Sequence, residues 1–95
     1  MKSNLINEVL ANKRILEIFK IVKKVHGDNH PEFHQIYDLY LKLYQAFKAQ
    51  DETSATNIFN ELKIVSNHYE IPNDVCETYA MVINYLEDLE KRYYA

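Results

Sequence analysis

Four histidines and one cysteine are the side chains of this 95-residue chain best suited to chemistry. His30 and His34 are four residues apart, and side chains with that spacing project from one face of a helix, as the metal ligands of helical bundles do. His26 precedes this pair across a short turn, so its ring can approach that of His30. His68 and Cys76 flank a second connection further along the chain. Neutral imidazoles that converge in this way predict a site for iron or zinc.

Carboxylates near the same two connections add oxygen ligands to this set. Glu32 follows His30 closely, and Glu77 follows Cys76. A mixed nitrogen–oxygen shell suits iron or zinc. The sequence therefore suggests a metal site formed by His26, His30, His34 and His68, with Glu32, Cys76 and Glu77 as additional candidate ligands.

Each of these residues also has a purely structural explanation. A histidine at a helix C-terminus, such as His26, interacts favourably with the helix dipole. His34 lies beside the predicted apolar stripe of its helix, and a single cysteine such as Cys76 is most often a small buried hydrophobic residue. The alternative to an iron or zinc site is therefore that the chain binds no metal.

The sequence lacks the common catalytic motifs. It contains no glycine-rich phosphate loop, no G-x-S-x-G segment and no H-E-x-x-H segment. Cys76 and His68 could form a thiolate–imidazole pair, but no part of the sequence indicates an oxyanion hole beside it. There is thus no positive indication of an enzyme.

Helices must position these residues, because apolar residues recur every three or four positions in four successive segments. We expect four helices joined by short connections, at about 4–26, 30–50, 52–70 and 74–94. Short connections make neighbouring helices antiparallel, which predicts an all-α, up-down-up-down four-helix bundle with residues 1–95 in one domain. That topology places all four histidines and Cys76 at the same end of the bundle.

Residues at the expected helix ends support these boundaries. Gly27 is expected to be left-handed just beyond the first helix. Asn29 with Glu32, and Asp74 with Glu77, have the spacing of capping boxes at the starts of the second and fourth helices. The third helix must stop before Pro72, because the residue before a proline resists helical geometry.

The apolar stripes predict both a core and an exposed aromatic surface. The core is expected to contain Phe19, Tyr40, Leu43, Leu62, Val82 and Leu86. Eight tyrosines and four phenylalanines exceed what a bundle of this size must bury, so some remain exposed. Tyr44, Tyr93 and Tyr94 are the candidates, and they suggest a homodimer or a dedicated protein partner.

The composition restricts the other classes of partner. A formal net charge of −3 gives no electrostatic reason to expect nucleic acid as a partner. The single cysteine excludes an internal disulfide and suits a reducing compartment. The first expected helix carries too many charges for a signal peptide or a membrane span, so we expect a cytoplasmic protein without a membrane partner.

The run Val25–Phe33, VHGDNHPEF, resembles a segment of the RIC family (repair of iron centres, the ScdA/YtfE type). In that family the segment also lies at the first helix-to-helix turn. The segment DVCETY over 74–79 and the C-terminal YYA are similar to short proteins often placed with the family. The resemblance implies a hemerythrin-like four-helix bundle with a di-iron centre, which helps to restore damaged iron–sulfur clusters after nitrosative or oxidative stress.

The chain departs from the family's ligand pattern. The family uses a histidine early in the first helix and H-x-x-x-E pairs further on, but here no histidine precedes His26. His34 is followed four residues later by Asp38, and His68 by Pro72. The standard di-iron site is therefore incomplete. The leading hypothesis is a short RIC-like protein in iron–sulfur cluster repair or metal handling, and the alternative is a metal-free helical interaction module that has kept only the fold.

Overall fold

The computed structural model describes residues 2–95, and within that range the chain forms five α-helices and no β-strand. They are α1 (Ser3–Ala11), α2 (Lys13–His26), α3 (Glu32–Lys48), α4 (Glu52–Val65) and α5 (Glu77–Tyr94). The all-helical fold class predicted from the apolar pattern is confirmed. None of the helices described is long and apolar enough to cross a membrane.

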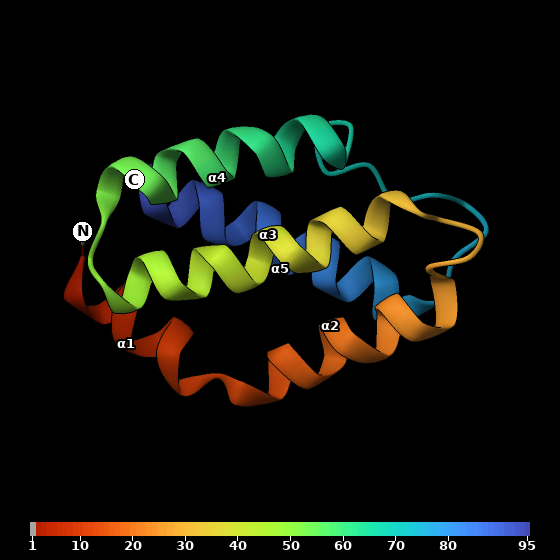
Figure 1. Cartoon of the computed structure of the whole chain (residues 1–95), viewed down its shortest axis with the longest axis horizontal. Coiled ribbons are helices and arrows are strands. Elements are labelled where there is room, and N and C mark those ends of the chain that lie inside the picture. Colours follow the sequence, from red (N-terminus) through yellow and green to blue (C-terminus); the bar gives the residue numbers. More distant parts are fainter. Residues whose placement is uncertain (1) are drawn as a thin grey trace.

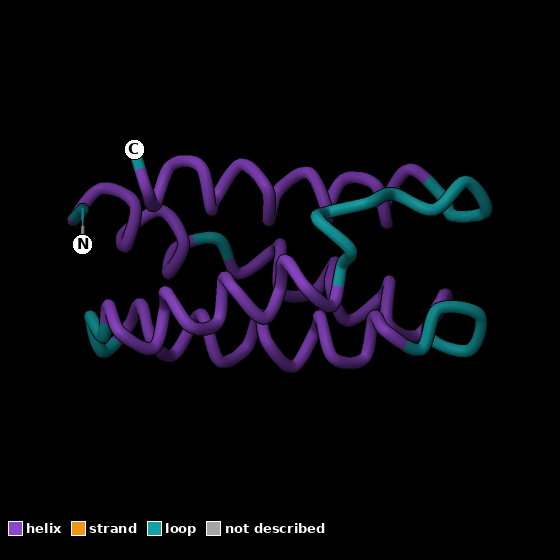
Figure 2. The backbone as a smooth tube through the Cα atoms, turned by 90° about the horizontal axis from the view of Figure 1, so that it is seen from above, coloured by secondary structure: helices purple, strands orange, loops and turns teal. Residues whose placement is uncertain are grey.

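The helices run back and forth along the long axis of the molecule, whose extents are 36 × 24 × 19 Å (Figure 1). Helices α1 and α2 follow one another along one side, α3 packs against α1, α2 and α4, and α5 packs against α2. The 27–31 turn and the 66–76 segment lie at the same end, whereas the 49–51 turn, the start of α1 and the end of α5 lie at the other (Figures 1 and 2). The expected grouping of the two histidine-bearing connections at one end is therefore observed.

The single helix predicted over 4–26 is instead two helices that meet at Asn12. The backbone of Asn12 is not helical (φ −86°, ψ 70°), and its Oδ1 accepts a hydrogen bond from the Ile15 N–H at 3.2 Å, which caps α2. Val9 belongs to the buried stripe of α1, and Ile15 begins that of α2. An uninterrupted helix would turn these two side chains about 120° apart, so the break lets both face the core.

Helix α4 ends at Val65, before the predicted limit at residue 70. Asn67, His68 and Tyr69 have positive φ angles (53°, 61° and 61°), a left-handed backbone that cannot continue a right-handed helix. Ser66 stabilises this turn, because its Oγ accepts a hydrogen bond from the Tyr69 N–H at 2.8 Å. The turn still returns the Tyr69 side chain to the core.

The capping boxes expected at the starts of α3 and α5 do not form, and both helices begin two or three residues later than predicted. Pro31 and Cys76 occupy the N-cap positions, and neither makes a side-chain capping hydrogen bond. The carboxylates of Glu32 and Asp74 bind His30 instead. These acids therefore serve a cluster between the two connections rather than the helix termini.

Gly27 is also not left-handed as expected, because its backbone lies in the helical region (φ −61°, ψ −27°). Close packing explains the glycine instead. A Cβ atom at this position would meet the Lys23 carbonyl oxygen and would lie 2.6 Å from His34 Nε2. The turn between α2 and α3 is therefore tight enough to require a residue without a side chain.

The core contains all six residues predicted for it: Phe19, Tyr40, Leu43, Leu62, Val82 and Leu86 are buried. The rings of Phe19 and Tyr40 stack with centroids 4.4 Å apart, which joins α2 to α3. The Tyr40 hydroxyl lies 2.8 Å from that of Tyr85, which joins α3 to α5. Helices α2, α3 and α5 are therefore joined through one aromatic group in the core.

Of the three tyrosines expected to be exposed, only Tyr94 is largely so, at 54 %. Tyr44 is half-buried, and its hydroxyl donates to the Leu10 carbonyl oxygen at 3.2 Å. Tyr93 is also half-buried and lies within 3.0 Å of the Thr56 hydroxyl. The expected aromatic surface is therefore smaller than the composition suggested.

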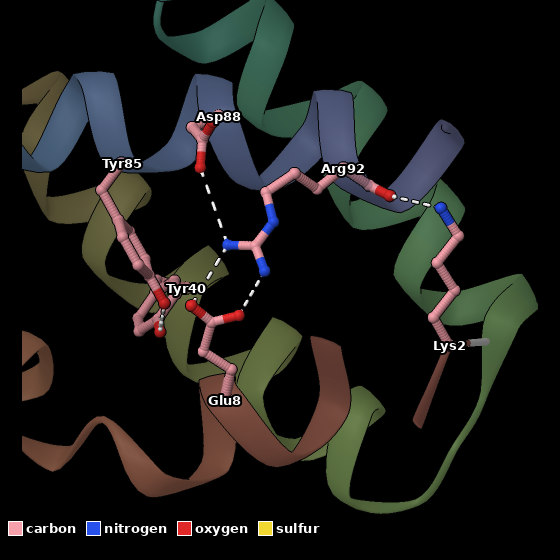
Figure 3. Close-up of polar contacts among 6 residues, drawn as sticks. All are labelled: Lys2, Glu8, Tyr40, Tyr85, Asp88 and Arg92. Atoms are coloured by element: carbon pink, nitrogen blue, oxygen red, sulfur yellow. Dashed lines mark hydrogen bonds and ion pairs between the residues drawn. The ribbon is translucent and has the colours of Figure 1, made fainter. Parts of the chain in front are cut away.

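A polar network fastens α1 to α5 at the end opposite the histidines (Figure 3). Arg92 pairs with Glu8 of α1 and lies 3.8 Å from Asp88 on its own helix. Lys2 reaches the Arg92 carbonyl oxygen at 3.4 Å. These groups are exposed, so the network contributes to the position of α1 more than to overall stability.

Candidate functional site

His26 and Cys76 form a side-chain pair at the histidine-bearing end of the molecule. His26 is the last residue of α2, and Cys76 directly precedes α5. The packing of α2 against α5 brings His26 Nε2 to 3.1 Å from Cys76 Sγ, although the two residues are 50 positions apart. The Cys76 side chain is exposed, so an imidazole and an accessible thiol lie within hydrogen-bond distance.

His30 binds two carboxylates through its two ring nitrogens. Nδ1 lies 2.8 Å from Glu32 Oε1, and Nε2 lies 2.8 Å from Asp74 Oδ1. Desolvation alone would lower the pKa of His30, but the hydrogen bonds to Glu32 and Asp74 outweigh it and raise that pKa. Both nitrogens donate when the ring is protonated, so the two carboxylates favour the charged form of His30.

The ring of Tyr79 packs against the rings of both histidines. It is buried in the first turn of α5, and its ring centroid lies 5.5 Å from that of His26 and 5.7 Å from that of His30. Burial, together with the charges of Glu32 and Asp74, raises the pKa of Tyr79 to about 12. Tyr79 therefore remains a neutral aromatic support.

The thiol of Cys76 is more acidic than an ordinary cysteine. The hydrogen bond to His26 contributes most, and the backbone N–H groups of Tyr79 and Thr78 contribute further, so the pKa of Cys76 falls to about 7. A thiol with this pKa is roughly half ionised at neutral pH. The site thus presents a thiolate to solvent under ordinary conditions.

The other predicted ligands lie elsewhere. His34 is exposed on α3 and lies over Gly27. His68 is exposed in the left-handed turn and lines a surface pocket with Lys63 and Glu87 on the α4–α5 side. The second predicted carboxylate ligand, Glu77, is exposed at the start of α5. The structure therefore brings together His26 with Cys76, and His30 with Glu32, but not the four histidines with one another.

This arrangement does not fit a di-iron centre. Across residues 2–95, no group of three or more His, Cys, Asp or Glu side chains is arranged to hold a metal ion. A metal-binding imidazole must be deprotonated, whereas His30 is stabilised as a cation by Glu32 and Asp74. The metal site suggested by the sequence remains a prediction.

Two residues of this site were not anticipated as members of it. Asp74 was assigned to a helix cap and Tyr79 to the apolar stripe of the last helix. Asp74 follows Pro72 closely in a connection, where a carboxylate is free to turn toward the neighbouring helix. The topology places Asp74 and His30 at the same end of the bundle, and this was the feature of the sequence from which their contact could have been predicted.

Comparison of the chain with models of known families, with curated proteins and with solved structures finds no match. The RIC resemblance is therefore confined to short segments of the sequence, and the His26–Cys76 pair and the His30 cluster are the features of the structure that bear on function.

Proposed function

We propose that this chain is a helical interaction module with a hemerythrin-like four-helix arrangement, which assists RIC-type repair of iron–sulfur clusters and carries no di-iron centre of its own. The observation that supports this function is that His26 and His30 are hydrogen-bonded to other side chains of the same chain. His30 lies between two carboxylates, and His26 is paired with Cys76. Contacts within the chain therefore use two of the four histidines that would otherwise bind metal.

Exposed apolar side chains on α2 offer a surface for a partner. Ile21 and Val25 are exposed and four residues apart, so they lie on the same face of the helix. Val25, at 63 % exposure, directly precedes His26. Covering these side chains removes apolar area from water, which favours association. In this proposal the partner is a complete repair protein of the resembled family.

A reconstituted repair assay tests this function. An enzyme that depends on a [4Fe–4S] cluster is inactivated with nitric oxide, and its recovery is followed with a purified RIC-type protein, with this chain, and with both. We expect the chain to accelerate recovery only when the RIC-type protein is present. Recovery that is the same with and without the chain would contradict the proposal.

A matched pair of surface variants locates the contact. Val25→Asp places a charge on the proposed surface of α2, and we expect it to remove the acceleration. Ile64→Asp introduces the same charge at a residue of α4 that is 77 % exposed, and we expect it to leave the acceleration unchanged. Surface substitutions of this kind change stability by only about 0.5 kcal/mol. Equal effects of the two variants would show that α2 is not the contact surface.

Metal handling is the second candidate function, with the metal as cargo rather than as a resident cofactor. The observation in its favour is the 3.1 Å separation of His26 Nε2 and Cys76 Sγ. Imidazole and thiolate are both common ligands of zinc and iron, but two ligands are fewer than a closed site requires. A stable complex would therefore need further ligands from another molecule or from solvent.

Thermal melts with and without Fe²⁺ or Zn²⁺ separate the two candidates. Binding to the folded state raises the melting temperature, and this effect should strengthen above pH ~6.5 as imidazoles deprotonate. The interaction module predicts no metal-dependent shift. A shift that is lost in Cys76→Ser would support metal handling by the pair, whereas a shift lost in His30→Ala would assign it to the His30 cluster.

A further inference from the structure

Cys76 is an accessible thiol with a proton acceptor, His26, beside it. It is the only cysteine of the chain, it is exposed, and its Sγ lies 3.1 Å from His26 Nε2. The two residues come from different elements, the end of α2 and the position before α5. A nucleophile within hydrogen-bond distance of a base is the arrangement that activates cysteine nucleophiles.

The surroundings hold this pair in place. The His26 ring stands at 90° to the ring of Tyr79, with centroids 5.5 Å apart, so an edge-to-face contact orients the imidazole. Cys76 occupies the N-cap position of α5, where the backbone N–H groups of Thr78 and Tyr79 favour the thiolate form of its sulfur. The Tyr79 contact, the end of α2 and the start of α5 therefore orient the pair.

The other titratable groups near the pair leave the thiolate stable. The Asp74 carboxylate, two positions before Cys76, is turned toward His30, with Oδ1 2.8 Å from Nε2, rather than toward the sulfur. Glu77, the next residue along the chain, is exposed to solvent, which screens its charge. Tyr79 remains neutral because burial raises its pKa. His26 is therefore the group that acts most directly on the sulfur.

We propose that Cys76 is a reversible modification site, whose thiolate, with His26 as the proton acceptor, reacts with low-molecular-weight disulfides to form a mixed disulfide. This inference does not depend on the interaction function proposed above. It assigns the thiol a substrate class, small disulfides, and a product, the chain carrying one disulfide-bonded thiol.

The exchange balances without another reactant. The Cys76 proton passes to His26, and the thiolate attacks one sulfur of the disulfide. The S–S bond of the reagent breaks as the new S–S bond to Cys76 forms, and the other half leaves as a thiolate with the electron pair. Cys76 is oxidised to the mixed disulfide, the released half is reduced, and the proton on His26 passes to that half or to solvent.

The acidity of the thiol matches this chemistry. The pKa of Cys76 is lowered to about 7, chiefly by the hydrogen bond to His26, and attacking thiols react fastest when their pKa is near the ambient pH. Loss of the histidine would return the pKa toward about 8.5, and a complete return would leave about 16-fold less thiolate at pH 7. The more basic thiolate would be about fivefold more nucleophilic, so the net reaction would be about threefold slower.

The test is the rate of reaction with an aromatic disulfide that releases a coloured thiol, measured from pH 5 to 10. Because the chain has one cysteine, the rate reports Cys76 alone. We expect a midpoint near pH 7 for the native protein. A native midpoint near about 8.5, the value of an ordinary thiol, would overturn the proposal whether or not any variant folds.

Two histidine variants test whether His26 causes the low midpoint of the Cys76 reaction. His26→Ala is expected to move the midpoint upward and slow the reaction about threefold at pH 7. His68→Ala, at an exposed histidine on the α4–α5 side, is the matched control and should keep the native profile. Circular dichroism confirms that each variant remains helical, and His26→Gln replaces His26→Ala if the latter unfolds. An unchanged midpoint in a folded His26 variant would refute the role of this histidine.

Oxidised glutathione tests the proposed substrate class directly. Intact-protein mass measurement should show one added thiol per chain, fully reversed by a reductant and absent in Cys76→Ser. No adduct on the native protein, under conditions where the aromatic disulfide reacts, would exclude small aliphatic disulfides as substrates and contradict the proposal.

Discussion

The hydroxyl pair formed by Tyr40 and Tyr85 offers a quantitative test of the core (Figure 3). The two oxygens lie 2.8 Å apart, between α3 and α5. Tyr40 is fully buried, whereas Tyr85 is half-buried. Removing one hydroxyl leaves the other without its partner, and an unsatisfied buried polar group costs about 1–3 kcal/mol. Removing both hydroxyls avoids this cost.

The two single variants should therefore differ from each other and from the double variant. Tyr85→Phe leaves the fully buried Tyr40 hydroxyl unpaired and should cost about 2–3 kcal/mol. Tyr40→Phe leaves the Tyr85 hydroxyl, which is nearer to solvent, and should cost about 1–2 kcal/mol. The double variant should cost less than the sum of the two, because neither hydroxyl remains to be satisfied.

Urea melts followed by circular dichroism measure these differences, provided that the dependence on urea concentration stays the same among the variants. Tyr94→Phe is the matched control, because Tyr94 is 54 % exposed, and it should change the free energy of unfolding by less than about 0.5 kcal/mol. Costs for Tyr40→Phe and Tyr85→Phe that simply add in the double variant would refute the coupling of the two hydroxyls.

Three further predictions test the core, the pH dependence and the tight turn. Leu86 is fully buried, so Leu86→Ala should lower the free energy of unfolding by about 2–5 kcal/mol in denaturant melts, and a loss below about 0.5 kcal/mol would show that its face of α5 is misassigned. Because the pKa of His30 is raised in the folded state, its stabilising contribution is complete below the unfolded pKa of about 6.5 and is lost as the pH rises through the higher folded value. His30→Gln should remove that pH dependence from the melting temperature, and an unchanged profile would contradict the assignment. Gly27→Ala should lower the melting temperature, because its Cβ would lie 2.6 Å from His34 Nε2. The double variant Gly27→Ala with His34→Ala should recover part of this loss. A Gly27→Ala protein that melts at a higher temperature than the native protein would show that the turn relaxes freely.

The apolar pattern predicted the core well because burial follows directly from helical periodicity. The stripe through Tyr40 and Leu43 on α3 and the stripe through Val82 and Leu86 on α5 are buried as expected. The break at Asn12 was missed, although the pattern contains its signal. The stripe before that residue and the stripe after it are out of phase on one continuous helix.

The end of α4 was harder to predict than the break between α1 and α2. The spacing from Leu62 through Val65 to Tyr69 continues the three-four repeat, and Tyr69 is indeed buried. It reaches the core through a left-handed turn rather than through another turn of helix. Two backbone routes thus bury the same side chain, and the hydrogen bond from the Tyr69 N–H to Ser66 Oγ stabilises the one observed.

The sequence predicted where the site lies, but not which side chains pair with one another. Topology places all the histidines near one end, and the structure agrees, because His34 lies over Gly27 and His68 lies in the 66–76 segment at the same end as His26 and His30. Which side chains meet depends on the rotation of each helix about its own axis. Cys76 therefore pairs with His26 rather than with His68, the partner considered from the sequence. A rotation of this kind is decided by the packing of the whole core and is not encoded in a local motif.

The interior of the histidine-bearing end explains why its polar residues lie at the rim. A metal centre between helices needs ligands that point inward from facing helices. Here the inward positions are aromatic: Phe33 and Tyr79 are buried, and their ring centroids lie 5.0 Å apart. The imidazoles of His26 and His30 lie against the Tyr79 ring and turn their nitrogens toward Cys76 and toward carboxylates. An aromatic interior with a polar rim favours chemistry at the surface, where a thiolate meets reagents from solvent, over a metal centre enclosed by the helices.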